Sequence, residues 1–154
     1  MVFESIRPKT AIPGKLAPLQ SLVNISRLVS AYYTEKPKFI AGTSKYVEFG
    51  TSGHRGSSFK GTFNEPQIAA IAQAICEYRR DHQITGPLFI GFDTHALSEP
   101  AYRTAIEVLT GKGVKVITHK NGEFTPTPVI SREILRYNAG RTEGLADGIV
   151  ITPS

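Results

Sequence analysis

The sequence has 154 residues, 40% hydrophobic and 20% charged, which is enough for one domain with a real core and is ordinary for a soluble globular protein. It contains no apolar run that could cross a bilayer, nothing after Met1 resembles a signal peptide, and the single Cys76 excludes an internal disulfide, so we expect a cytoplasmic location and no membrane partner. The net charge is +5, which either is balanced by acidic residues of further domains or suits an anionic ligand such as a phosphate. The basic residues are scattered and not interleaved with aromatic residues, so we expect no nucleic acid.

The first 44 residues have the pattern of an appendage. A helix is predicted from about Pro18 to Glu35, because apolar residues recur at helical spacing and proline is tolerated in a first turn. A linker from Pro37 to Ser44 follows. Since the apolar face of a peripheral helix must be covered, we expect residues 1–44 to dock on this chain or on a second copy, which would make a homodimer.

Residues 45–154 alternate between strand and helix patterns. Strands are predicted at 46–49, 88–92, 114–118 and 148–151. Helices are predicted after Asn64, which has Gln67 at the capping-box position, after a cap at Ser98, and from Thr127 to about Tyr137. This order predicts an α/β domain with a mostly parallel mixed sheet flanked by helices. Ligands of such sheets gather at the carboxyl ends of the strands. The loops there are expected to begin at Gly50, Asp93, His119 and Thr152.

A glycine-rich loop runs from Gly50 to Gly56 and contains Arg55. Its backbone N–H groups could approach an anion closely, and a guanidinium offers a planar fork for phosphate oxygens. Thr51, Ser52, Gly53 and His54 could contribute to the same phosphate site. A plain turn with a solvated Arg55 is an equally good interpretation of the pattern, and a lone loop histidine is more often simply solvated.

A second candidate is Ser154, which follows the strand 148–151 and a Thr152-Pro153 pair. A hydroxyl on a rigid turn just past a buried strand is a common position for a nucleophile. The alternative is an ordinary solvated loop serine. Asp93 could orient Arg55 or form a local Asx turn. No metal-ligand spacing connects the histidines at 54, 82, 95 and 119.

The glycine-rich segment 49–56 and the segment 148–154 together resemble the α-D-phosphohexomutases, and among them the bacterial phosphoglucomutases with a long N-terminal extension. The stretches 91–98 and 124–128 are similar to the same family, so the resemblance covers residues 46–154 in several separate motifs. One departure is His95, where many members have arginine.

The resemblance implies an isomerase that interconverts glucose 1-phosphate and glucose 6-phosphate. Ser154 would be the phosphorylated catalytic serine, glucose 1,6-bisphosphate the intermediate, and Arg55 an active-site residue near the phosphoserine. Mg²⁺ would touch this chain only through the phosphate on Ser154, with its other ligands in a later domain, so the segment alone is expected to be inactive. Two alternatives stay open: another hexose phosphate, such as that of mannose or glucosamine, and a non-catalytic phosphate-binding α/β module.

Overall fold

The structure is a computed structural model that describes residues 14, 16–18, 21–50 and 53–153. Its described strands form one parallel sheet in the order β2-β1-β3, from β1 (Leu88–Phe92), β2 (Val116–Ile117) and β3 (Asp147–Ile151). β1 lies in the middle, in register with β2 through Phe89 and Ile117 and with β3 through Phe92 and Ile151. Every residue of β1 is buried, which explains its uninterrupted apolar sequence.

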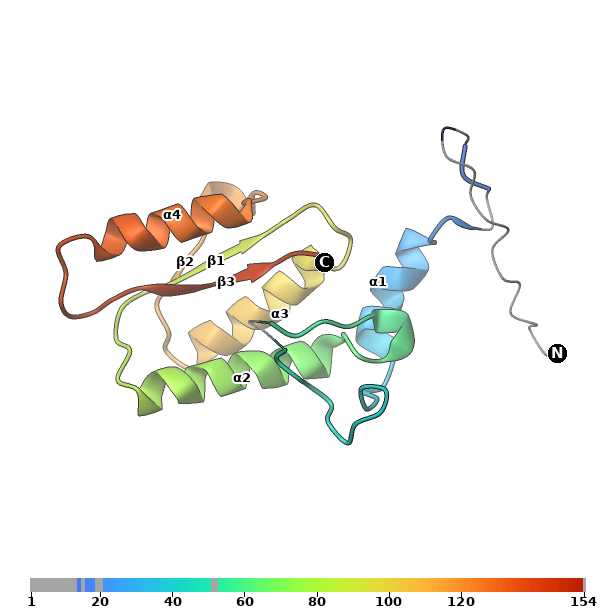
Figure 1. Ribbon diagram of the computed structural model, residues 1–154, viewed down its shortest axis with the longest axis horizontal. Helices are drawn as coiled ribbons and strands as arrows, with labels where there is room; N and C mark the ends of the chain where they lie inside the picture. Colours follow the sequence, from blue (N-terminus) through green and yellow to red (C-terminus); the bar gives the residue numbers. More distant parts are fainter. Residues whose placement is uncertain (1–13, 15, 19–20, 51–52, 154) are drawn as a thin grey trace.

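Helices cover both faces of the sheet, as Figure 1 shows. α2 (Glu65–Asp81) and α3 (Ser98–Gly111) lie on one face, and α4 (Thr127–Asn138) lies on the other. Because side chains alternate along a strand, Leu88, Ile90 and Phe92 enter the core with α3, while Phe89 packs with Ile130 of α4. The fold is therefore the α/β class that the sequence predicts. None of the described helices has the length and apolar character needed to cross a membrane.

Two glycines let α4 approach the sheet closely. A Cβ at Gly91 would lie 2.7 Å from Ile130 Cγ1. A Cβ at Gly148 would lie 2.7 Å from the Phe89 carbonyl oxygen and 2.8 Å from Ile134 Cδ1. Real Cβ atoms do not come this close to other atoms, so glycine at both positions sets the spacing between helix and sheet.

The N-terminal helix is shorter than predicted. α1 (Ile25–Thr34) begins after Asn24, whose side chain accepts a hydrogen bond from the Arg27 amide at 2.9 Å. Leu28 and Tyr32 belong to the same core as α2 and α3, and the Tyr32 hydroxyl donates to Thr104 Oγ1 at 2.8 Å. Burial raises the pKa of Tyr32, so this donor stays neutral. One side of α1 therefore docks within the chain itself. Ile25 and Tyr33 of α1 are exposed, as are Leu22 and Val23 just before the helix.

Three local predictions were wrong. The stretch 46–49 is not a strand of the sheet: within the described chain it contributes only an antiparallel bridge between Phe49 and His54. The loop after Gly50 therefore does not leave a strand end. Ser98 is the first residue of α3 and not its cap, because its hydroxyl donates to Asp93 instead. The predicted strand 114–118 is reduced to the two residues of β2.

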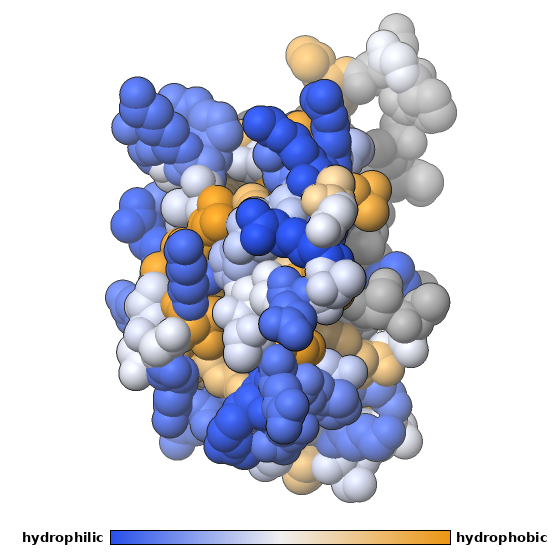
Figure 2. All heavy atoms as spheres, turned by 90° about the vertical axis from the view of Figure 1, so that its left-hand side faces the viewer, coloured by the Kyte–Doolittle hydropathy of each residue, from blue (hydrophilic) through white to orange (hydrophobic). Residues whose placement is uncertain are grey.

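Other boundaries agree with the prediction. Asn64 caps α2 by accepting from the Gln67 amide at 3.2 Å. The Gln67 side chain does not complete a capping box, since its amide donates to the Tyr46 carbonyl at 2.8 Å. At the amino ends of the strands, the left-hand side of Figure 1, the surface is mostly hydrophilic with apolar patches between the charged side chains (Figure 2).

Candidate functional site at the carboxyl edge of the sheet

The ends of β1 and β3 meet at one edge of the sheet and are joined there by a side chain. Asp93 directly follows β1, and its amide donates to the Ile151 carbonyl at 3.2 Å, which prolongs the strand pairing by one step. Thr152 directly follows β3, and its hydroxyl donates to Asp93 Oδ2 at 2.8 Å. β3 ends at this edge, beside the start of α3 (Figure 1).

The second oxygen of the Asp93 carboxylate is held as well. Oδ1 accepts from the Ser98 hydroxyl at 2.7 Å and from the His95 amide at 3.0 Å. The latter bond is the Asx turn that the sequence offers as one of two roles for Asp93. Partial burial by itself raises the pKa of Asp93, but the hydrogen bonds from Ser98, His95 and Thr152 outweigh it and leave this pKa below its ordinary value. Asp93 is therefore an ionised acceptor at neutral pH.

A third segment, Phe124 and Thr125, packs at the same edge of the sheet. The Thr125 amide donates to the Phe92 carbonyl at 2.8 Å, and the Phe124 ring lies edge-on to the Phe92 ring with centroids 5.4 Å apart. His119, after β2, is exposed and lies 3.4 Å from Glu123 Oε2 through its Nδ1. Two stretches that the sequence singled out, 91–98 and 124–128, are thus neighbours in space, with Thr152 beside them.

The glycine-rich loop is held by its own contacts. The Gly50 amide donates to the Gly53 carbonyl at 3.3 Å, and His54 Nε2 lies 2.7 Å from the Thr62 carbonyl oxygen. A Cβ at Gly56 would lie 1.9 Å from that same oxygen, so the third glycine is required by packing within the loop. The His54 ring thus has an internal structural partner, which its sequence context alone did not indicate.

Arg55 is exposed and forms no ion pair within the described part of the chain. Thr51, Ser52 and Ser154 lie outside the described residues. The phosphate-binding roles predicted for 51–55 and the catalytic role predicted for Ser154 therefore stay predictions. Among the residues described, no three His, Cys, Asp or Glu side chains gather as a metal site would require.

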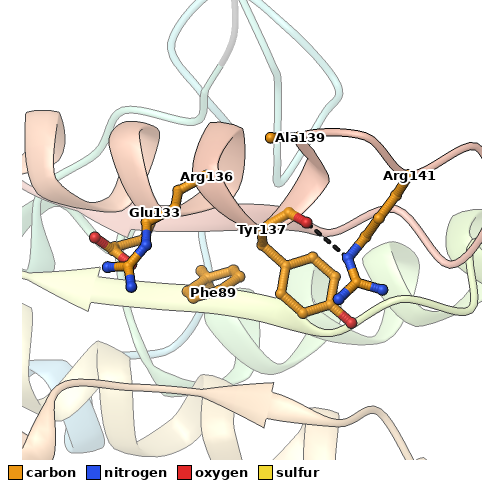
Figure 3. Close-up of a pocket in the computed structure, with 6 residues that line it drawn as sticks. All are labelled: Phe89, Glu133, Arg136, Tyr137, Ala139 and Arg141. Carbon is orange, nitrogen blue, oxygen red and sulfur yellow. Dashed lines mark hydrogen bonds and ion pairs between the residues drawn. The ribbon is translucent and has the colours of Figure 1, made fainter.

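A surface hollow lies elsewhere on the molecule. It measures about 360 Å³ and lies where α4 packs on Phe89, towards the amino ends of the strands (Figure 3). The Arg141 guanidinium lies 4.3 Å from the Tyr137 ring centroid, and its Nε donates to the Tyr137 carbonyl at 2.7 Å. Arg136 Nη1 lies 3.5 Å from Glu133 Oε2. Because these cations are already engaged and the hollow is far from the sequence motifs, the carboxyl edge is the better candidate site.

Comparison with known proteins agrees with this geometry. Residues 46–154 match the family described as phosphoglucomutase/phosphomannomutase, alpha/beta/alpha domain I. The chain belongs to this family. It is also 55% identical over 141 residues to a phosphoglucomutase of Komagataeibacter xylinus, an alignment that covers 92% of this chain and 25% of that protein. This phosphohexomutase chain thus spans about a quarter of its relative's length, and the alignment, being longer than 46–154, includes part of the N-terminal segment.

The family assignment confirms the resemblance and the fold that the sequence predicts. Sequence reasoning did not select Thr152 as a site residue, although it occupies the position after β3. The available signal was a hydroxyl in that position, because the carboxyl ends of paired parallel strands lie side by side. Ser98 was noticed only as a cap, and its bond to Asp93 had no sequence signal.

Proposed function

We propose that this chain is the first domain of a phosphoglucomutase that interconverts glucose 1-phosphate and glucose 6-phosphate. The observation that carries the proposal is the 55% identity to a protein of that name over nearly the whole chain. The convergence of the family motifs on the edge where Thr152 lies supports it. The name of the matched family includes phosphomannomutase, so mannose 1-phosphate is the second substrate to assay.

In this proposal Ser154 carries the phosphoryl group. The P–O bond to Ser154 breaks as a hydroxyl of the sugar phosphate forms a new P–O bond, which gives glucose 1,6-bisphosphate; the other phosphoryl group then returns to the serine. Such transfer needs an aligned nucleophile and positive charge near the phosphate oxygens. Arg55 would supply charge in a fork that matches those oxygens.

The Mg²⁺ of this proposal rests on the family resemblance alone. The described residues contain no cluster that could hold a metal ion by themselves. A phosphate oxygen on Ser154 would be the one ligand from this chain.

The test uses the full-length protein and the Ser154→Ala variant. Peptide mass spectrometry should find phosphate on Ser154, and the variant should lose turnover by at least about 1000-fold, because a missing nucleophile removes the covalent route. Ser131→Ala, an exposed serine on α4, is the matched control and should keep normal turnover. Normal turnover in Ser154→Ala would refute the proposal.

Arg55 is tested by Arg55→Lys in the same protein. Lysine keeps the charge but loses the bidentate fork, so kcat/KM for glucose 1-phosphate should fall by about tenfold or more. Arg132→Lys, on the exposed side of α4, should leave kcat/KM unchanged. If the two variants behave alike, Arg55 has no part in transferring the phosphoryl group.

A further inference from the structure

The bond between Asp93 and Thr152 joins residues 59 positions apart in the sequence. It is the second tie between these strand ends, since the Asp93 amide already donates to the Ile151 carbonyl. The chain leaving β3 is therefore fastened to β1 twice in succession, first through the backbone and then through a side chain. Two hydrogen bonds at neighbouring positions fix both the place where the chain leaves β3 and the direction in which it leaves.

The carboxylate that makes this bond cannot turn freely. Its Oδ1 is held by the hydroxyl of Ser98, the first residue of α3, and by the amide of His95 in the loop before that helix. Oδ2 is left for Thr152, and an ionised carboxylate only accepts, so the Thr152 hydroxyl must donate. The orientation of the threonine side chain is thereby set by the start of α3 and the loop before it, and α3 packs in the hydrophobic core of the domain.

Few rotations separate this anchor from the serine. Pro153 follows Thr152, so it restricts the backbone of Thr152 and has its own φ fixed by its ring. The next residue is Ser154. An anchored threonine followed by a proline therefore restricts the backbone that leads to Ser154. Misplacing a reacting group by about 1 Å can cost on the order of 100-fold in rate.

We propose that Asp93 is a positioning residue that aligns Ser154 for phosphoryl transfer by holding the hydroxyl of Thr152. This inference rests on the proposed function, since it requires Ser154 to be the nucleophile. Asp93 acts through Thr152 and not on the substrate. An anionic carboxylate facing a phosphate would repel it, whereas the carboxylate of Asp93 is directed at three hydrogen-bond donors.

The experiment compares Thr152→Val, Thr152→Ser and Asp93→Asn in the full-length protein. Valine keeps the shape of threonine without the hydroxyl, so kcat should fall about 10- to 100-fold while KM for glucose 1-phosphate stays within about twofold. Serine keeps the hydroxyl and should restore most of kcat. Thr110→Val is the matched control, because within the described residues that hydroxyl bonds only in its own helix, to the Ile106 and Glu107 carbonyls.

Asp93→Asn provides a second route to the same result. Its amide has one oxygen where the carboxylate has two, so one of the three donors must face an NH₂ group. Asp93→Asn should also lower kcat. If Thr152→Val does not fold, Asp93→Asn tests the positioning role in its place. A kcat unchanged in both variants overturns the positioning role, as does a loss that appears only as a lower melting temperature.

Hydrogen exchange supplies a readout that does not depend on activity. The peptide covering residues 147–154 should exchange faster in Thr152→Val than in Thr152→Ser or Thr110→Val, because the anchor is lost. Equal exchange in all three overturns the inference. An inactive wild-type protein without phosphate on Ser154 refutes the proposed function instead, and this result is distinct from an active wild type in which Thr152→Val keeps its kcat.

Discussion

Asp93 and Asp147 lie at opposite ends of the sheet and have opposite kinds of partner. Asp147 opens β3 and pairs with Arg79 of α2, whose side chain is only 5% exposed and also donates to the Gly86 carbonyl. Asp93 follows β1 and accepts from two hydroxyl groups and an amide. At the amino end a carboxylate neutralises a buried cation, whereas at the carboxyl end a carboxylate orients neutral groups.

The difference shows how the partners of a carboxylate reveal its role. A buried guanidinium needs its counterion, so Asp147 is required for the fold itself. The donors to Asp93 are neutral, so removing it leaves no unpaired charge and mainly frees the segments that it holds. We therefore expect substitutions at the amino end to change stability and substitutions at the carboxyl end to change geometry.

The largest effect is expected from Asp147→Ala. It leaves the Arg79 charge buried without its partner, which should lower the free energy of unfolding by about 3 kcal/mol. Asp93→Ala loses hydrogen bonds to a charged carboxylate but leaves no buried charge without its partner, so it should cost less, about 1.5 kcal/mol. Urea unfolding of this chain measures both. Asp81→Ala, which removes an exposed pair with Arg80, is the control and should cost less than about 0.5 kcal/mol. Equal losses of unfolding free energy in Asp93→Ala and Asp147→Ala would contradict the proposed difference between the two ends of the sheet.

A smaller effect is expected from Gly86→Ala, also at the amino end. The added Cβ would lie 2.1 Å from the Leu145 carbonyl oxygen, and the backbone of this loop must shift to admit it. We expect a loss of about 1–3 kcal/mol. Gly111→Ala meets no atom within 4 Å and should be neutral or stabilising by up to about 1 kcal/mol. Matching melting temperatures for the two variants would show that the amino end is not tightly packed.

The smallest effect concerns acid. The pKa of Asp93 is lowered in the folded state, so its contribution to stability is present above the unfolded pKa and is lost as the pH falls through the folded pKa. The stability difference between wild type and Asp93→Asn should therefore be constant above about pH 5 and shrink below about pH 4. Thermal melts across this range check it. A difference that grows in acid would contradict the hydrogen-bonded carboxylate.

The elements that sequence reasoning predicted well are those with strong local patterns. β1 is an unbroken apolar run, and α2 has both a capping asparagine and an apolar stripe. The stretch 46–49 has strand-like residues, but its partners lie outside the sheet. The Tyr46 carbonyl accepts from the Gln67 side chain, and Phe49 forms a bridge with His54. Contacts with residues distant in the sequence determine the conformation of that segment, and local strand preference could not indicate these contacts.

The candidate site divides in the same way. The rule that loops at the carboxyl ends of parallel strands meet was sufficient to bring Asp93 and Thr152 to one edge. It could not show that they form a hydrogen bond, since no local pattern connects residues so far apart. It also misassigned the Gly50 loop, because that expectation depended on a strand that did not form. The hydroxyl of Ser98 resembled a helix cap because serine is common there, while its actual acceptor is a side chain.

The central position of β1 has a consequence for biosynthesis. On the ribosome β1, α3, β2 and α4 are all made before β3. Asp93 and Thr152 are 59 residues apart, so at about 5–20 residues per second Asp93 is synthesised roughly 3–12 s before its partner. Until β3 adds to the edge of β1, the nascent chain has no anchored Thr152. Thr152 and Pro153 are therefore positioned by the same event that completes the described sheet.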